Sequence, residues 1–197
     1  MNRIAWINHV TGRAHMLQRL MPLILIAFAG LSCNGNQREI GQADIERAQS
    51  ALKPFKKQLM SALTTALADG PDQAIRVCSV EAPRIARDLS SPDVEMGRTS
   101  HRLRNPENTP RSWMEPLLAG YVSDPAVSDP KTVMLDDHRF GYVEPIYVQS
   151  MCLTCHGDDV ALPIRETIAE NYPGDEAMGF NAGDFRGMFW VVMPLSD

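Results

Sequence analysis

The sequence predicts an α+β domain in which helices come first and antiparallel strands follow. Apolar residues recur at three- and four-residue spacing in the first half of the body, which is typical of helices that pack by one face. Segments rich in β-branched and aromatic residues gather in the second half. A tight turn joins two of these segments, which indicates antiparallel pairing, so we expect the early helices to pack on an antiparallel sheet.

Two helices are expected first. One runs over residues 44–69, where Asp44 can act as the N-cap and Pro54 should kink or interrupt the helix. The second covers residues 71–89 and is strained by Pro83.

The remaining elements follow from turn formers and from runs of β-forming residues. In chain order we expect a short strand and ordered loop over 97–108, a helix over 110–122, a loop over 123–130, strands over 132–135 and 140–148, a short helix over 163–171, and a strand over 185–194.

Composition limits the class of protein. The 197 residues carry a net charge of −5 and are 44% hydrophobic, which suits one globular domain. With no basic surplus to neutralise phosphates, nucleic acid is not an expected partner. The four cysteines are too few for a disulfide scaffold.

The N-terminal segment predicts export. Arg3, Arg13 and Arg19 are the only charged side chains before Cys33, and residues 20–31 form an apolar run. This run is shorter than the roughly 20 residues of a membrane-spanning helix, so it fits the apolar region of an export signal.

The end of the apolar run, Gly-Leu-Ser-Cys, resembles a bacterial lipoprotein processing site, although Gly30 stands where that site usually has an aliphatic residue. We therefore expect residues 1–32 to be a lipoprotein-type export signal, with Cys33 lipidated, residues 33–42 as a polar tether and residues 43–197 as one domain. A plain cleaved signal or an uncleaved anchor are the alternatives. Each places the domain outside the cytoplasm, which we expect to be the periplasmic side of a bacterial membrane. The residue after Cys33 favours the outer membrane by resemblance to lipoprotein sorting rules.

One short motif indicates a cofactor-binding site. It is Cys152-Leu153-Thr154-Cys155-His156, a C-x-x-C-H sequence. Two thiols at this spacing can bond to the two vinyl groups of one haem, and the adjacent imidazole can ligate its iron. We therefore predict one covalently bound haem c, held by Cys152 and Cys155 with His156 as an axial ligand. A zinc site would need further ligands at suitable spacing. A thioredoxin-like pair would need its C-x-x-C to open a helix after a buried strand, a context that is only partly met, and a plain disulfide is a third alternative.

The second axial ligand is left open by the residues alone. Cys78, His101, His138 and several methionines are candidates. Cys78 lies on the apolar face of its predicted helix, where a buried free cysteine is common. A lone thiol in an exported protein nevertheless needs a reason, and binding to iron would supply one.

Arginines cluster at positions 98, 102 and 104 of this acidic chain. Haem propionates need cationic or polar partners when they are partly buried. A solvated basic loop or internal ion pairs would explain the cluster equally well.

Several segments together resemble one bacterial family of exported, single-haem c-type proteins with a PAS-like fold, long catalogued as a domain of unknown function. They are AIRVCSVEAPRIA at 74–86, GRTS at 97–100, LRNPEN at 103–108, CLTCHG at 152–157, YP at 172–173 and GDFRG at 183–187. The resemblance spans about residues 43–195.

The resemblance implies a haem held between the helices and the sheet. It implies covalent links at Cys152 and Cys155, with His156 and Cys78 as axial ligands. It also favours Arg98 and Arg104 as partners of the propionates or of the loop that supports the haem.

A haem with both axial positions filled favours sensing or electron transfer over catalysis. A thiolate ligand stabilises ferric iron and lowers the reduction potential. We therefore expect redox or small-gas sensing, with an unidentified redox or signalling protein as partner and the membrane reached through the lipid anchor. A low-potential periplasmic electron-transfer cytochrome is the alternative. No distal acid–base residue for a peroxidase is identifiable, so we do not expect an enzyme.

Overall fold

The structure is a computed structural model that describes residues 38–124 and 126–196. The expected export signal, Cys33 and the first part of the tether lie outside these residues. Within them, no helix is both long enough and apolar enough to cross a membrane.

The first helix, α1, spans Gln42–Asp69 and continues through Pro54 without interruption. Its N-cap is Gly41, so the helix begins before the position that the sequence suggested. Asp44 still provides a hydrogen-bond acceptor at the start of the helix, because its carboxylate accepts a hydrogen bond from the Gly41 N–H at 3.1 Å. A stripe of buried side chains that includes Leu52, Phe55 and Leu59 faces the sheet.

The predicted second helix is a continuous helical rod of three parts. These are α2 (Pro71–Arg76), a π-helical turn (Val77–Glu81) and α3 (Ala82–Leu89). The N–H of Ala82 bonds to the carbonyl of Val77, five residues earlier. Pro83 has no N–H for a regular helical bond, so the strain expected there coincides with the wider turn. Cys78 lies inside this turn.

Four antiparallel strands form one sheet in the order β1-β4-β3-β2. The strands are β1 (Glu95–Thr99), β2 (Lys131–Met134), β3 (Arg139–Tyr147) and β4 (Phe185–Pro194). Each predicted strand is present within about two residues of its expected bounds, and the α+β class is confirmed.

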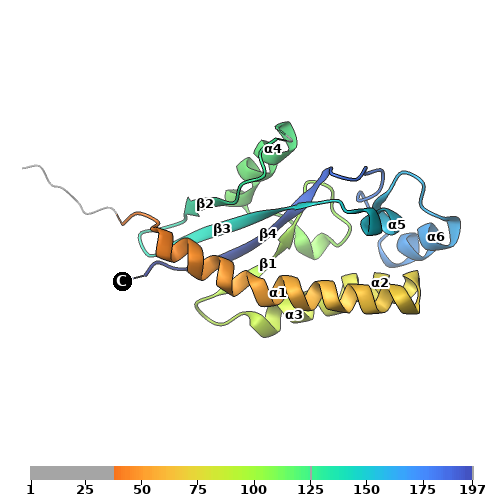
Figure 1. Cartoon of the computed structure of the whole chain (residues 1–197), viewed down its shortest axis with the longest axis horizontal. Helices are drawn as coiled ribbons and strands as arrows, with labels where there is room; N and C mark the ends of the chain where they lie inside the picture. The colour runs from red at the N-terminus through yellow and green to blue at the C-terminus, as the bar shows by residue number, and fades with distance from the viewer. Residues whose placement is uncertain (1–37, 125, 197) are drawn as a thin grey trace, which may run out of the picture. The chain divides into compact units, whose positions relative to one another are not determined.

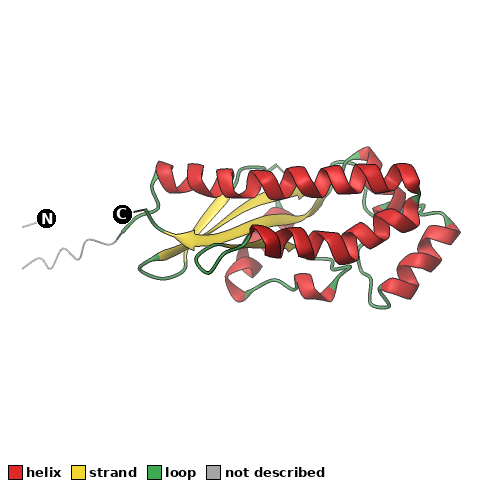
Figure 2. Cartoon of the chain, turned by 90° about the horizontal axis from the view of Figure 1, so that it is seen from below, coloured by secondary structure: helices red, strands yellow, loops and turns green. Residues whose placement is uncertain are grey.

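The helices cover the sheet unequally. The helices α1 and α2–α3 run side by side over one face, as Figures 1 and 2 show. On the opposite face lies α4 (Glu115–Ser123), which follows a 3₁₀ turn at Ser112–Met114. The short helices α5 (Leu153–His156) and α6 (Leu162–Asn171) lie beyond the end of the sheet. One core packs between α1, α3 and the sheet, and a second packs under α4.

Candidate functional site

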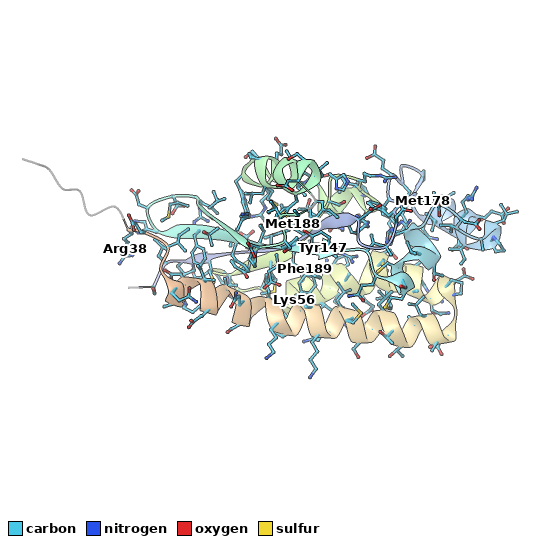
Figure 3. All side chains as sticks on the ribbon, turned by 45° about the horizontal axis from the view of Figure 1, so that its top comes forward. Arg38, Lys56, Tyr147, Met178, Met188 and Phe189 are labelled. Atoms are coloured by element: carbon cyan, nitrogen blue, oxygen red, sulfur yellow. The ribbon has the colours of Figure 1, made fainter. Side chains whose placement is uncertain are left out.

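Six residues that the sequence singled out in the body of the chain line one cavity. They are Cys78, Arg98, Arg104, Cys152, Cys155 and His156. The cavity lies where α1, the π-helical turn, the end of the sheet and α5 meet. Lys56, Tyr147 and Phe189 line it as well, and Figure 3 shows them together between α1 and the sheet. The fold therefore brings Cys78 to the same cavity as His156, 78 positions further along the chain.

The C-x-x-C-H segment is held by backbone hydrogen bonds. Cys152 ends a 3₁₀ turn, and α5 then carries Cys155 and His156. The carbonyl of His156 accepts a hydrogen bond from the Phe180 N–H at 2.9 Å, and the carbonyl of Gly157 accepts one from the Gly179 N–H at 2.8 Å. Both cysteines are free thiols, and burial raises the pKa of Cys155. The motif is thus fixed in place by the loop that follows α6.

His156 presents a defined tautomer. Its Nδ1 lies 2.6 Å from the carbonyl oxygen of Ala177, and a carbonyl only accepts hydrogen bonds, so Nδ1 carries the proton. Burial, together with the positive charges of Arg186 and Arg104, lowers the pKa of His156 to about 2. The ring is therefore neutral at physiological pH and keeps a free lone pair on Nε2. A neutral imidazole oriented through Nδ1 is a common arrangement for a metal ligand.

The π-helical turn places Cys78 at the wall of the cavity. Its side chain is half-buried and lines the cavity rather than a closed core. Arg98 on β1 donates from Nη2 to the Cys78 carbonyl oxygen at 3.2 Å. This hydrogen bond ties the turn to the sheet, so Arg98 supports the position of Cys78.

Arg104 holds the C-x-x-C-H segment to the loop after α6. The side chains of Arg104 and Asp175 are 7% and 4% exposed, and Nε and Nη2 donate to the two carboxylate oxygens at 3.0 and 3.1 Å. Nη2 also donates to the Cys155 carbonyl oxygen at 2.6 Å. Internal ion pairing, one of the alternatives from the sequence, is therefore what the structure shows for Arg104.

Arg186 is a site residue that the sequence analysis did not single out. It lines the cavity from β4, and Nη1 donates to the Ser100 hydroxyl at 2.7 Å and to the Arg102 carbonyl at 3.2 Å. Burial, together with the positive charges of the nearby Arg98 and Arg104, lowers the pKa of Arg186 to about 10. The sequence could have pointed to Arg186 through its place within the GDFRG segment at 183–187.

The cavity carries an excess of positive charge. Among the described residues, no carboxylate lies within ion-pair distance of Arg98 or Arg186, whereas Arg104 pairs with Asp175. Much of the remaining wall is apolar and comes from α1 and its neighbours. The apolar lining includes Leu59, Leu63, Leu67, Ile75 and Phe189. An apolar cavity with cationic groups fits a ligand that is largely apolar and carries negative charge.

The other candidates for the second iron ligand differ in whether they line the cavity. His101 is exposed and stacks on Phe185 at 5.5 Å between ring centroids, and His138 is exposed in the β2–β3 turn. Neither histidine lines the cavity, whereas Met60 and Met151 do. Cys78 thus shares the cavity wall with two methionines. Within the described residues, no three histidine, cysteine or acidic side chains are grouped to hold a bare metal ion.

Together, the fold and the site define an α+β protein whose helices and sheet enclose a C-x-x-C-H segment with a neutral imidazole in a cationic, partly apolar cavity. The Tll0287-like family model matches residues 28–194, and the chain belongs to that family. A solved structure described as the cyanobacterial heme-protein Tll0287 is similar in fold, with a TM-score of 0.61 and 22% identity. The match covers 80% of this chain and 99% of that one. No curated protein matches the sequence.

Proposed function

We propose that this chain is an exported, lipid-anchored haem protein that senses redox state or a small gas. In this proposal Cys152 and Cys155 hold one haem covalently, and His156 and Cys78 are its axial ligands. The observation that carries the proposal is the meeting of Cys78 with the C-x-x-C-H segment at one cavity. The solved relative in the same family, described as a heme-protein, supports the choice of cofactor.

The residues of the cavity fit a haem. Two thiols at this spacing suit thioether attachment, and the apolar wall suits the porphyrin face. The guanidinium groups of Arg98 and Arg186 have the charge that the propionates require. When bound, the haem supplies an iron that changes oxidation state and binds diatomic gases.

The chain's own residues orient this site. The Ala177 carbonyl keeps the proton of His156 on Nδ1, so Nε2 is available as the ligand atom. Arg104 fixes the backbone of Cys155, and Arg98 fixes the backbone of Cys78. The main chain is therefore held both at Cys78 and at Cys155, the residue before His156.

The choice of sensing over electron transfer rests on Cys78. A thiolate ligand lowers the reduction potential and binds ferrous iron less strongly than ferric iron. Cys78 is the ligand we expect to give up its position to nitric oxide or carbon monoxide after reduction. Its location in a π-helical turn supports this role, since such turns are frequent at functional sites. The proposal is one of ligand binding, without catalysis.

The proposal is tested on the full chain produced with a c-type haem maturation system. We expect a mass increase of one haem and a six-coordinate, low-spin ferric spectrum. Cys78→Ala should change the optical and electron paramagnetic resonance (EPR) spectra, whereas Cys33→Ser should leave them unchanged and release the protein from membranes. A colourless product with the mass of the bare polypeptide would contradict the proposal. Rapid electron exchange with a donor cytochrome, without gas binding, would favour the electron-transfer alternative.

A further inference from the structure

The carbonyl group that fixes the tautomer of His156 has a second hydrogen-bond donor. The Ala177 carbonyl oxygen accepts from His156 Nδ1 at 2.6 Å, and Arg104 Nη2 donates to the same oxygen at 3.3 Å. Ala177 and Arg104 are both buried, so water does not compete for this oxygen. A carbonyl oxygen has two lone pairs and can accept both bonds. Each bond draws on the electron density of one atom, so a stronger bond from Arg104 weakens the bond from His156.

Asp175 determines how strongly Arg104 donates to this carbonyl. The Asp175 carboxylate is buried and accepts from Nε at 3.0 Å and from Nη2 at 3.1 Å. Nη2 carries two protons but contacts three acceptors, because the Cys155 carbonyl at 2.6 Å is the third. Loss of the carboxylate would therefore strengthen the bonds from Arg104 to the two carbonyls. Asp175 Oδ1 also accepts from the Ala177 N–H at 3.0 Å, so the same carboxylate holds the residue that contacts His156.

The loop around Ala177 is held on both sides by another arginine. Arg102 donates from Nε to the Glu176 carbonyl at 2.9 Å and from Nη2 to the Met178 carbonyl. The Glu176 N–H in turn donates to the Leu103 carbonyl at 2.8 Å. These bonds do not involve Arg104 or Asp175. A change in that ion pair should therefore alter the strength of the bond at the Ala177 carbonyl more than the position of the loop.

We propose that the buried Arg104–Asp175 pair sets the strength of the hydrogen bond from His156 Nδ1 to the Ala177 carbonyl, and thereby how strongly Nε2 donates to the haem iron. Arg104 and Asp175 are positioning residues, since both act through Ala177. A stronger bond at Nδ1 places more negative charge on the imidazole, which favours ferric iron and lowers the reduction potential. This inference rests on the proposed function, in which His156 is an axial ligand.

The test uses two substitutions in the full chain carrying haem, with the potential measured by optical redox titration. Asp175→Asn removes the carboxylate charge, so Arg104 donates more strongly to the Ala177 carbonyl and the bond from His156 weakens. We expect the equilibrium constant for reduction to rise about tenfold, which is about 59 mV for one electron. Arg104→Lys keeps the positive charge but loses the planar fork of donors. The Ala177 carbonyl is then left to His156, and the equilibrium constant for reduction should fall about threefold.

The opposite signs separate this role from a structural one. Loosening of the loop would weaken the His156 bond in both variants, so a rise in potential for both would overturn the inference. The matched control is Asp158→Asn, which removes the same charge from an exposed position two residues after His156. Because solvent screens this charge, the control should change the equilibrium constant for reduction by less than about twofold. A control shift as large as that of Asp175→Asn would overturn the inference, since charge alone would then explain the effect.

The remaining outcomes distinguish this inference from the proposed function. An unchanged potential in both variants of a protein that carries one haem would overturn the inference and leave the proposed function intact. A parent chain that carries no haem would overturn both. If one of the two variants fails to fold, the sign of the shift in the other decides.

Discussion

At the scale of single residues, some members of the site can be recognised from a sequence motif, whereas others can be recognised only from their position in the folded chain. The C-x-x-C-H pattern alone was enough to predict Cys152, Cys155 and His156 as residues of one site, because neighbours in sequence are neighbours in space. Arg186 and Tyr172 reach the cavity from β4 and from the end of α6, and their chemical types alone do not distinguish them from other arginines and tyrosines. Arg104 was predictable as a site residue, but its pairing with Asp175, 71 positions away, was not.

The ion pair between Arg104 and Asp175 should be important for stability. Arg104→Ala leaves the Asp175 carboxylate buried without its partner, and loss of one member of a buried pair costs about 3–5 kcal/mol. The free energy of unfolding, measured by denaturant titration, should fall by that amount. Arg84→Ala is the matched control, because Arg84 is 54% exposed and pairs with Glu81 and Asp88 at the surface. We expect the control to cost less than about 1 kcal/mol. Equal losses in the two variants would argue against a special role for Arg104.

At the scale of secondary-structure elements, local patterns predicted the strands well and the interior of the second helix less well. The predicted terminal strand over 185–194 matches β4 because its residues favour strands throughout. In contrast, the π-helical turn at Val77–Glu81 has no periodicity of its own, and Pro83 indicated only that the helix is strained. The turn depends on tertiary contacts, such as the hydrogen bond from Arg98 to the Cys78 carbonyl.

The start of β4 should tolerate no side chain at Gly187. This residue has φ of 155°, and a Cβ built there would lie 2.3 Å from the Thr99 carbonyl oxygen. Gly187 pairs with Ile146 of β3 and lines the cavity, so the backbone has little freedom to move away. Gly187→Ala should destabilise the protein by about 1–3 kcal/mol in a denaturant titration.

A second glycine provides a control, because its substitution by alanine is expected to raise the stability rather than lower it. Gly120 is exposed within α4, and a Cβ there would contact nothing within 4 Å. Gly120→Ala should raise the stability by about 0.5–1 kcal/mol, because alanine favours helix over glycine. A stabilising Gly187→Ala substitution would show that the β1–β4 approach is looser than the structure indicates.

At the scale of the whole domain, the first helix is joined to the end of the last strand through a buried carboxylate. Asp44 is 3% exposed, and its Oδ1 accepts hydrogen bonds from the Ser196 N–H at 2.7 Å and from Arg47 at 3.1 Å. Arg47 also donates to the Pro194 carbonyl at 3.2 Å. The two ends of the domain thus meet at one charged group.

This junction should make the stability of the domain sensitive to acid. Burial raises the pKa of Asp44, but the hydrogen bonds from Ser196 and Gly41 outweigh burial and hold the pKa below its ordinary value of 3.8. The unfolded chain therefore binds this proton first, and the stabilisation is complete above the unfolded pKa and is lost as pH falls through the folded pKa. Asp44→Asn should lower the free energy of unfolding at pH 7 and flatten its decline in acid. Asp137→Asn, at an exposed site in the β2–β3 turn, is the control and should keep the slope of the parent protein. If Asp44→Asn retains the parent slope in denaturant titrations between about pH 5 and pH 2, another group governs the acid response.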